Sequence, residues 1–171
     1  IARYCDEMVP DGNGGTEPRF RANLYLTKAS DAYKVLKDMA TIFRGLIYLI
    51  DGQVHPVIDQ AKDPVYNFSK ANVIDGNFSY QTAGDKTRTN QFLVTWINPD
   101  NNWQREVLIV EDRDNIIETG RVIRRQAEAF GCTSQGQATR FGRWKLWTAL
   151  NNTEVVSFST GINASYLRPG D

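Results

Sequence analysis

Residues 131–171 read GCTSQGQATRFGRWKLWTALNNTEVVSFSTGINASYLRPGD, and the rest of the chain is organised around them. Ser134 is a favourable helix N-cap, and Gln137 three residues later completes a capping box, so a helix is predicted over about 134–150. Residues 155–159 then have the composition of a strand. A second strand is expected to follow and to end at the closing Pro-Gly-Asp.

One side of this predicted helix is lined mainly with small residues. At about 100° per residue, the apolar positions fall on one face with Phe141 on its edge. These positions are Ala138, Gly142, Leu146, Ala149 and Leu150. Because three of them are Ala or Gly, the helix backbone can lie close to a neighbour. We expect the remaining chain to supply a sheet that this face covers.

The composition is that of an ordinary globular protein. The chain has 171 residues, of which 41% are hydrophobic and 23% charged, and its formal net charge is zero. No overall field therefore attracts it to nucleic acid or to a membrane. No apolar run approaches the ~20 residues that a membrane-spanning helix needs. Since the chain does not begin with Met and ends at an unfinished turn, we expect it to be part of a longer polypeptide.

The first third of the chain predicts a strand and then a helix. Residues 19–26 alternate apolar and polar side chains, which is typical of a half-buried strand. Ser30 is the predicted N-cap of a helix over about 30–43, and Gly45 its left-handed C-terminal cap. The expected buried face of this helix consists of Ala32, Val35, Leu36, Met39, Ala40, Ile42 and Phe43.

A hairpin is expected next. Asp51-Gly52 predicts a type I′ turn that joins a strand over 46–50 to one over 53–58. Pro56 cannot donate to a ladder, so the second strand should be an edge strand. His55 is the chain's only histidine, and without a second histidine or a nearby cysteine a metal or catalytic-triad role is not expected.

The second half predicts a sheet. Strands are expected over 77–81, 91–97 and 103–110, and a further strand over 121–130. Because the strand over 91–97 has apolar residues on both faces, it should be central. The acidic cluster 111–115 lacks the glycine and the bidentate glutamate of an EF-hand loop, so it is interpreted as the capped start of a short helical turn that ends at Gly120.

Other candidate sites are weak. The glycine-rich residues 11–15 are followed by Pro18 and an extended segment rather than by a helix, so a surface loop is favoured over a phosphate loop. Cys5 and Cys132 are too few for a disulfide framework and are expected to be free thiols. No nucleophile–base pair and no metal-ligand spacing occurs. We therefore assign no catalytic residue, no metal and no cofactor.

Basic and aromatic residues gather in the last third of the chain. They are Arg121, Arg124, Arg125, Arg140, Arg143 and Lys145, with Trp144 and Trp147. Such a set could bind a nucleic-acid backbone with stacked bases, but the balanced charge favours a solvated face with a contact surface for another chain. Arg140, Arg143, Trp144 and Trp147 lie off the helix's main packing face, and they are the candidate interface residues.

Several strings together carry a family resemblance. They are RYCDEMVPDGNGGTEPRF at 3–20, IFRGLIYL at 42–49, NVIDGNFSY at 72–80, AFGCTSQGQATRFGRWKL at 129–146, and VSFSTG at 156–161 with the closing LRPGD. In this order they resemble the lambda-type phage tail tip attachment proteins, also called host specificity protein J. The resemblance covers nearly the whole chain.

The resemblance implies a location and partners. The family forms a three-fold hub at the distal end of a siphophage tail, similar to the central hubs of contractile-tail baseplates. It implies a homotrimer of the full-length protein at the virion tail tip, made in the bacterial host cytoplasm. The implied partners are other tail tip and tail tube proteins, and the host cell surface through other parts of the chain. No specific nucleic-acid binding, catalytic residue or receptor residue is implied for this stretch.

The prediction is therefore an α+β fold with mixed or antiparallel sheets and two main helices, similar to a phage tail hub. Residues 1–72 would form an α/β lobe and residues 73–171 a β-rich lobe with the long helix. The favoured function is a structural hub that organises the distal tail for host attachment and DNA delivery. The alternatives are a cell-wall glycan hydrolase, which needs paired carboxylates roughly 5–10 Å apart, and a nucleic-acid-binding module.

Overall fold

The computed structural model describes residues 1–26, 31–82 and 88–171, and it has the α+β composition that the sequence predicts. The helices are α1 (Ala2–Asp6), α2 (Ala32–Ile42), α3 (Arg113–Thr119) and α4 (Gln135–Asn151). The strands are β1 (Met8–Pro10), β2 (Thr16–Pro18), β3 (Gly45–Ile50), β4 (Gln53–Ile58), β5 (Ser79–Thr82), β6 (Gln91–Asn98), β7 (Gln104–Glu111), β8 (Arg124–Glu128) and β9 (Glu154–Ser157). The 3₁₀ turns η1 (Ile74–Gly76), η3 (Pro99–Asn101) and η4 (Ile162–Ala164) lie between them.

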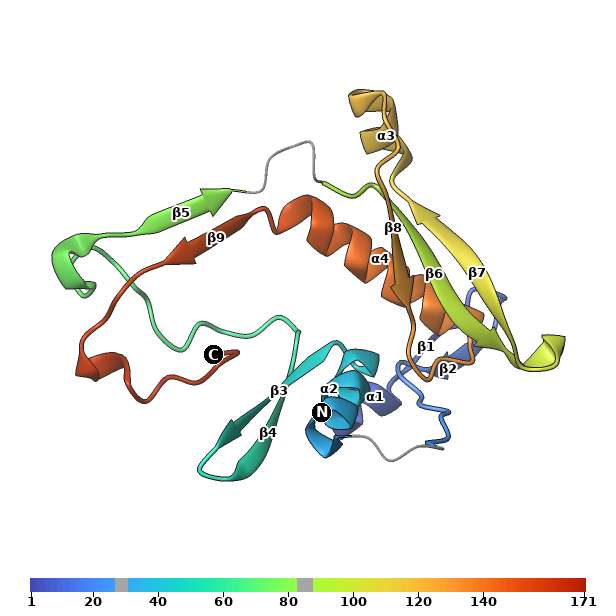
Figure 1. Ribbon diagram of the computed structural model, residues 1–171, viewed down its shortest axis with the longest axis horizontal. Helices are drawn as coiled ribbons and strands as arrows, with labels where there is room; N and C mark the ends of the chain where they lie inside the picture. Colours follow the sequence, from blue (N-terminus) through green and yellow to red (C-terminus); the bar gives the residue numbers. More distant parts are fainter. Residues whose placement is uncertain (27–30, 83–87) are drawn as a thin grey trace.

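The core lies between α4 and a three-stranded sheet, and this confirms the expected packing of the small-residue stripe (Figure 1). The sheet order is β7-β6-β8, with β6 antiparallel to β7 and parallel to β8, so β6 is central as predicted. Phe92, Val94 and Trp96 of β6 are buried beneath α4. A Cβ atom at Gly142 would lie only 2.6 Å from Cγ2 of Val110. The backbone of α4 therefore lies so close to the sheet at this position that only glycine fits.

The start of α4 confirms the predicted N-cap but not the whole capping box. The Ser134 side chain accepts a hydrogen bond from the backbone N–H of Gln137. The Gln137 amide, however, does not return to Ser134. It is buried, and it pairs with the backbone of Arg21, accepting from its N–H at 3.0 Å and donating to its carbonyl at 3.1 Å. The Gln137 side chain, which a capping box would use at the helix start, bonds instead to a segment 116 residues earlier in the sequence.

The predicted strand over 19–26 is wrong. This segment has no partner strand among the described residues and runs beside the start of α4. Its backbone is held instead by Gln137 and by the carbonyl of Gly131, which accepts from Asn23 at 2.9 Å. The alternation of side chains is real, but the hydrogen bonds that would make it a strand go to a helix and a loop.

Helix α2 is confirmed, with changes at both ends. Ser30 lies outside the described residues, and Asp31 is the N-cap, accepting from the N–H of Tyr33 at 2.9 Å. The left-handed residue at the C-terminus is Arg44, with φ of 58°, rather than Gly45. Gly45 already begins β3, where a Cβ atom would lie 2.7 Å from the carbonyl oxygen of Val57. Glycine is required there for the close approach of two strands, and not for the cap.

The face of α2 that was expected to be buried is only partly covered. Ala40 is its one buried residue, whereas Met39 is 38% exposed. The hairpin β3–β4 beside it is confirmed, with left-handed Asp51 and Gly52 in the turn and Pro56 opposite Ile47. Because this sheet has two strands, both are edge strands.

The remaining elements follow the prediction until the last segment. Helix α3 begins at the N-cap Asp112 and ends at left-handed Gly120, and β8 forms within the predicted 121–130. Strand β9 pairs antiparallel with β5. The expected second strand after β9 is absent from the described residues, because η4 and the following turn satisfy their amides locally: Ala164 N–H donates to the carbonyl of Gly161 and Leu167 N–H to that of Ala164.

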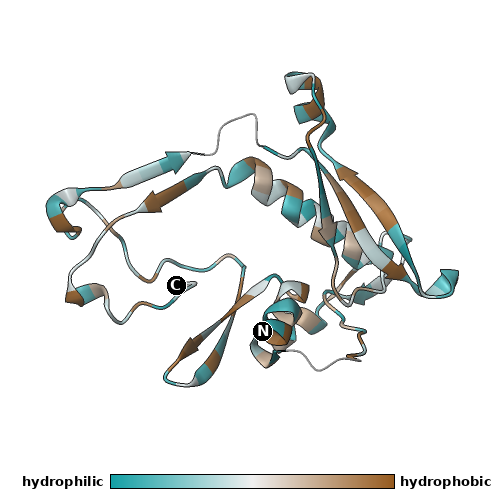
Figure 2. Ribbon diagram, in the orientation of Figure 1, coloured by the Kyte–Doolittle hydropathy of each residue, from teal (hydrophilic) through white to brown (hydrophobic). Residues whose placement is uncertain are grey.

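The fold is open. The β5–β9 ribbon extends away from α4 and the central sheet (Figure 1), and all of its residues are exposed. Apolar residues occur along β9 in this ribbon and along β7 in the central sheet (Figure 2). No helix among the described residues is long and apolar enough to cross a membrane. The division into lobes 1–72 and 73–171 stays a prediction, and the guanidinium of Arg44 donates across it to the carbonyl of Arg140 at 3.1 Å.

Candidate functional site

The four candidate interface residues all lie on α4. Arg140, Arg143, Trp144 and Trp147 have the spacing i, i+3, i+4, i+7, which places them on one side of a helix. Their surroundings differ, however. Arg140 and Trp144 are engaged with other parts of the chain, whereas Arg143 and Trp147 are exposed.

Arg140 joins α4 to the N-terminal segment. Its guanidinium donates to the carboxylate of Glu17 at 2.8 Å, to the carbonyl of Arg19 at 3.0 Å and to the carbonyl of Pro10 at 3.1 Å. The side chains of the ion pair are only 19% and 18% exposed. Glu17 also accepts from the hydroxyl of Ser134. The carboxylate thus occupies the positive end of the helix dipole and neutralises the arginine at the same time.

Trp144 joins α4 to the end of the β3–β4 hairpin. Its indole N–H donates to the carboxylate of Asp59 at 3.0 Å. The guanidinium of Arg44 lies 5.6 Å from its ring centroid and the ammonium of Lys145 lies 4.8 Å from it. Burial lowers the pKa of Arg44, with neighbouring Arg19 and Arg140 adding to the effect.

Trp147 and Arg143 are exposed, so their side chains are available for contacts with another protein. The Trp147 side chain is 61% exposed and Arg143 is also exposed. Neither side chain has an ion pair or an aromatic partner in the part of the chain that the structure describes. The assignment of the four residues to an interface stays a prediction, and Trp147 with Arg143 is the part of the set whose side chains face solvent.

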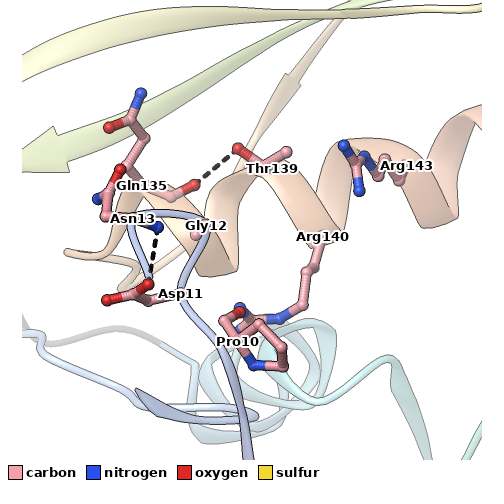
Figure 3. A pocket seen from close by; sticks show the side chains of 9 residues that line it. Pro10, Asp11, Gly12, Asn13, Gln135, Thr139, Arg140 and Arg143 are labelled. Atoms are coloured by element: carbon pink, nitrogen blue, oxygen red, sulfur yellow. Dashed lines mark hydrogen bonds between the residues drawn. The ribbon is translucent and has the colours of Figure 1, made fainter. Parts of the chain in front are cut away.

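A depression of about 450 Å³ lies between the Asp11 loop and the first turns of α4 (Figure 3). Its one carboxylate, Asp11, is used inside the loop, where it accepts from the N–H groups of Asn13 at 2.7 Å and Gly15 at 3.0 Å. Thr139 donates its hydroxyl to the carbonyl of Gln135 at 2.8 Å. The loop is therefore a surface turn, as predicted, and its Asp11 carboxylate is already paired within it.

Three other sequence candidates are explained by local packing. His55 stacks on Tyr48 at 5.6 Å between ring centroids. Hydrogen bonds from Gln91 and Arg113 lower the pKa of Glu111 in the acidic cluster. Cys132 is a buried free thiol whose pKa burial raises to about 11. In the described ranges no group of three His, Cys, Asp or Glu side chains could hold a metal ion.

The sequence did not predict two residues that hold the site, Glu17 and Asp59. Glu17 and Asp59 anchor Arg140 and Trp144, but they lie 123 and 85 residues away along the chain. No short motif signals such a pairing. The sequence signal that would have helped is the helix N-cap itself, because an N-terminus that packs inside a protein requires an anion or a polar partner.

Comparisons with known proteins agree with the resemblance. A family model described as "Putative phage tail protein" matches residues 31–171. The chain is 38% identical over 168 residues to the tip attachment protein J of Escherichia phage SECphi27, covering 98% of this chain and 14% of that protein. It is 35% identical over 173 residues to the tip attachment protein J of Escherichia phage SECphi4, covering 99% and 15%. The chain thus spans about a seventh of the length of these relatives.

Proposed function

Because the chain belongs to this phage tail protein family and is homologous to tip attachment protein J, we propose that it is a structural hub component of the tail tip. In this role it organises the distal tail of a phage or prophage for host attachment and DNA delivery. The full-length protein forms a homotrimer around the tail axis. It contacts other tail tip and tail tube proteins, and reaches the host surface through other parts of its chain.

The observation that carries this proposal is the amount of exposed surface. The chain exposes 12,021 Å². A compact monomer of 19.4 kDa is expected to expose about 8,500 Å². An obligate interface buries about 1,000–2,500 Å² or more on each partner, so the excess of about 3,500 Å² is enough surface for one or more such contacts. A chain with this much uncovered surface is suited to a role in which neighbours complete it.

Several exposed apolar side chains lie on strand faces that no other element of the described chain covers. Val107 and Ile109 on β7 are 58% and 59% exposed, and they lie on the sheet face opposite α4. In the β5–β9 ribbon Tyr80 and Val155 are equally open. A two-stranded ribbon is marginal in water on its own. Exposed apolar side chains on uncovered strands are suited to contacts with other proteins.

Trp147 and Arg143 are the proposed anchors on α4. Exposed tryptophan beside arginine is typical of interface hot spots, because both bury a large contact area and keep a polar group for the rim. Arg140 and Trp144 hold the helix against residues 10–19 and Asp59. They therefore set the orientation of the surface that Trp147 presents.

The test compares two exposed tryptophans in an assembled tail. Trp147→Ala is expected to leave the melting temperature within about 2 °C of the parent, since it removes little buried area. Completed tails should fall about tenfold or more if the side chain is an anchor. Trp103→Ala is the matched control, because Trp103 is 64% exposed in the β6–β7 turn.

Two outcomes would contradict the proposal. Tails that complete normally with Trp147→Ala would remove this residue from an essential interface. A full-length protein whose native mass corresponds to one copy, rather than three, would exclude the trimer.

The alternatives have less support. Each of five surface depressions has at most one carboxylate in its lining: Asp11, Glu128, Asp59 or Glu111 in four of them, and none in the fifth. Glycan hydrolysis needs a pair. For nucleic-acid binding, a steep loss of DNA affinity with salt would be the distinguishing result.

A further inference from the structure

Strand β8 leaves one edge of the central sheet open. It is the terminal strand in the order β7-β6-β8, and it has no neighbour on its outer side among the described residues. The carbonyl of Ile123 and the N–H of Ala129 point toward β6, where they bond to Asn90 and Thr95. Because backbone groups alternate along a strand, those of Arg124, Gln126 and Glu128 point outward. This edge can accept another strand.

A groove of about 470 Å³ runs between this edge and α4. Its apolar lining includes Phe92, Phe141 and Trp144. The rings of Phe141 and Trp144 lie 6.0 Å apart. An extended chain added beside β8 would therefore direct every second side chain into this groove.

The groove has two cations without anionic partners. Arg125 and Lys145 both line it, and neither forms an ion pair within the described part of the chain. The ammonium of Lys145 lies over both rings, 4.8 Å from the centroid of Trp144 and 5.7 Å from that of Phe141. The one carboxylate in the lining, Glu128, is paired with Arg105 at 3.4 Å. The groove is thus complementary to acidic side chains.

We propose that the outer edge of β8 binds an extended acidic segment of a neighbouring protein chain, which adds to the sheet as a fourth strand. Main-chain hydrogen bonds to residues 124, 126 and 128 hold the segment, and its alternate acidic side chains meet Arg125 and Lys145. The inference rests on the proposed function only in taking the neighbour to be a tail protein.

The probe is a synthetic peptide, acetyl-Thr-Glu-Val-Glu-Val-Glu-Thr-amide, with a lysine counterpart in which each Glu is replaced. Binding to the purified 171-residue chain is followed by calorimetry and by tryptophan fluorescence, since Trp144 lines the groove. We expect the acidic peptide to bind about tenfold more tightly than the basic one at low salt, with the difference shrinking as salt is added. Equal binding of the two peptides, or no binding of either, would overturn the inference.

Two further comparisons separate strand addition from charge attraction alone. N-methylation of every second peptide amide should abolish binding in one register and spare it in the other, because only one set of amides faces β8. Gln126→Pro removes an outward N–H that β6 does not use, whereas Gln126→Ala keeps it. Loss of binding is expected for the proline variant only. If both N-methylated peptides bind like the parent, no strand is added.

The charge requirement has its own variant. Replacing Arg125 and Lys145 together with Glu should reverse the preference to the lysine peptide by a similar factor. An unchanged preference in a folded double variant would contradict the assigned role of these cations. A negative result in the peptide or charge-reversal experiments would not contradict the proposed tail function. That function is tested separately by tail completion with Trp147→Ala.

Discussion

Gly142 shows how a single residue sets the distance between α4 and the sheet. An added Cβ atom would meet Val110 at 2.6 Å and Val94 at 2.9 Å, and both belong to the buried core. Protein cores resist such overlap because they are packed as densely as organic crystals. Glycine costs the helix about 1 kcal/mol relative to alanine, so its presence here reflects packing rather than helix propensity.

We expect Gly142→Leu to lower the free energy of unfolding by about 1–3 kcal/mol or more, because the larger side chain must push the sheet away. Arg143→Leu is the control, since it puts the same side chain on the same helix at an exposed position. Denaturant unfolding of both variants measures the difference. A Gly142→Leu protein that unfolds like the parent would show that the helix does not pack as described.

Cys132 provides a second prediction at the residue scale, based on pH. Burial raises its pKa from 9.0 to about 11, so the folded state holds the thiol proton more tightly than the unfolded state does. The associated stability is fully present below pH 9 and is lost as pH rises toward about 11. The loss should approach about 2–3 kcal/mol. Cys132→Ala should lack this part of the alkaline slope.

Thiol chemistry gives an independent check on Cys132. In the native protein a thiol reagent at pH 8 should react with half-buried Cys5 well before buried Cys132, and in denaturant it should count two free thiols. Equal native rates would mean that Cys132 is not protected. No free thiols in denaturant would contradict the unbridged state.

At the scale of elements, the important contact is between the N-terminal segment and α4. Glu17 is the middle residue of β2, and it links Ser134 and Arg140 across 117 and 123 residues of sequence. Helix α1 and strands β1 and β2 have no large core of their own, since Val9 is their one buried hydrophobic residue. Their position therefore depends on this polar contact.

We expect Glu17→Gln to destabilise the protein by about 1–3 kcal/mol, because the nearly buried Arg140 guanidinium would lose its anion. Glu7→Gln is a matched control. Glu7 also pairs with an arginine, Arg19, but its side chain is 53% exposed, and removing such a pair costs less than about 1 kcal/mol. Thermal unfolding compares the two variants, and equal effects would show that Glu17 does not have this structural role.

At the scale of the whole molecule, stability is expected to be uneven. The core around β6 and α4 contains most of the buried hydrophobic residues, while the β5–β9 ribbon is exposed along its whole length. Regions with few buried contacts open locally at little cost in free energy. We therefore expect the β5–β9 ribbon to be only locally stable in the isolated chain and to become stable when another protein covers it.

Hydrogen exchange can test this unevenness. In the isolated chain, the amides of β5 and β9 should exchange about tenfold or more faster than those of β6. In assembled tails they should become protected, because a neighbour then covers the ribbon. Protection of β5 and β9 in the isolated chain would mean that the ribbon needs no partner. Continued fast exchange in the tail would exclude it from the interface.

Local sequence signals were sufficient for the elements whose geometry depends on near neighbours. The cap at Ser134, the Asp51-Gly52 turn and the left-handed Gly120 were all predictable, because each satisfies backbone groups within a few residues. The apolar periodicity of α4 likewise identified the helix face that packs on the core, and the two apolar faces of β6 predicted its central position. The family followed from strings spread along the whole chain, which neither propensity nor composition supplies.

Tertiary contacts decided the remaining features, since they depend on residues far apart in sequence. Residues 19–26 have strand-like alternation, yet their amides bond to Gln137 and Gly131. The sequence pattern placed Arg140 on an exposed face, but its ion pair with Glu17 holds it in a largely buried position. A side chain with several possible partners takes those that the folded chain brings within about 3 Å. Sequence spacing cannot show which partners those are.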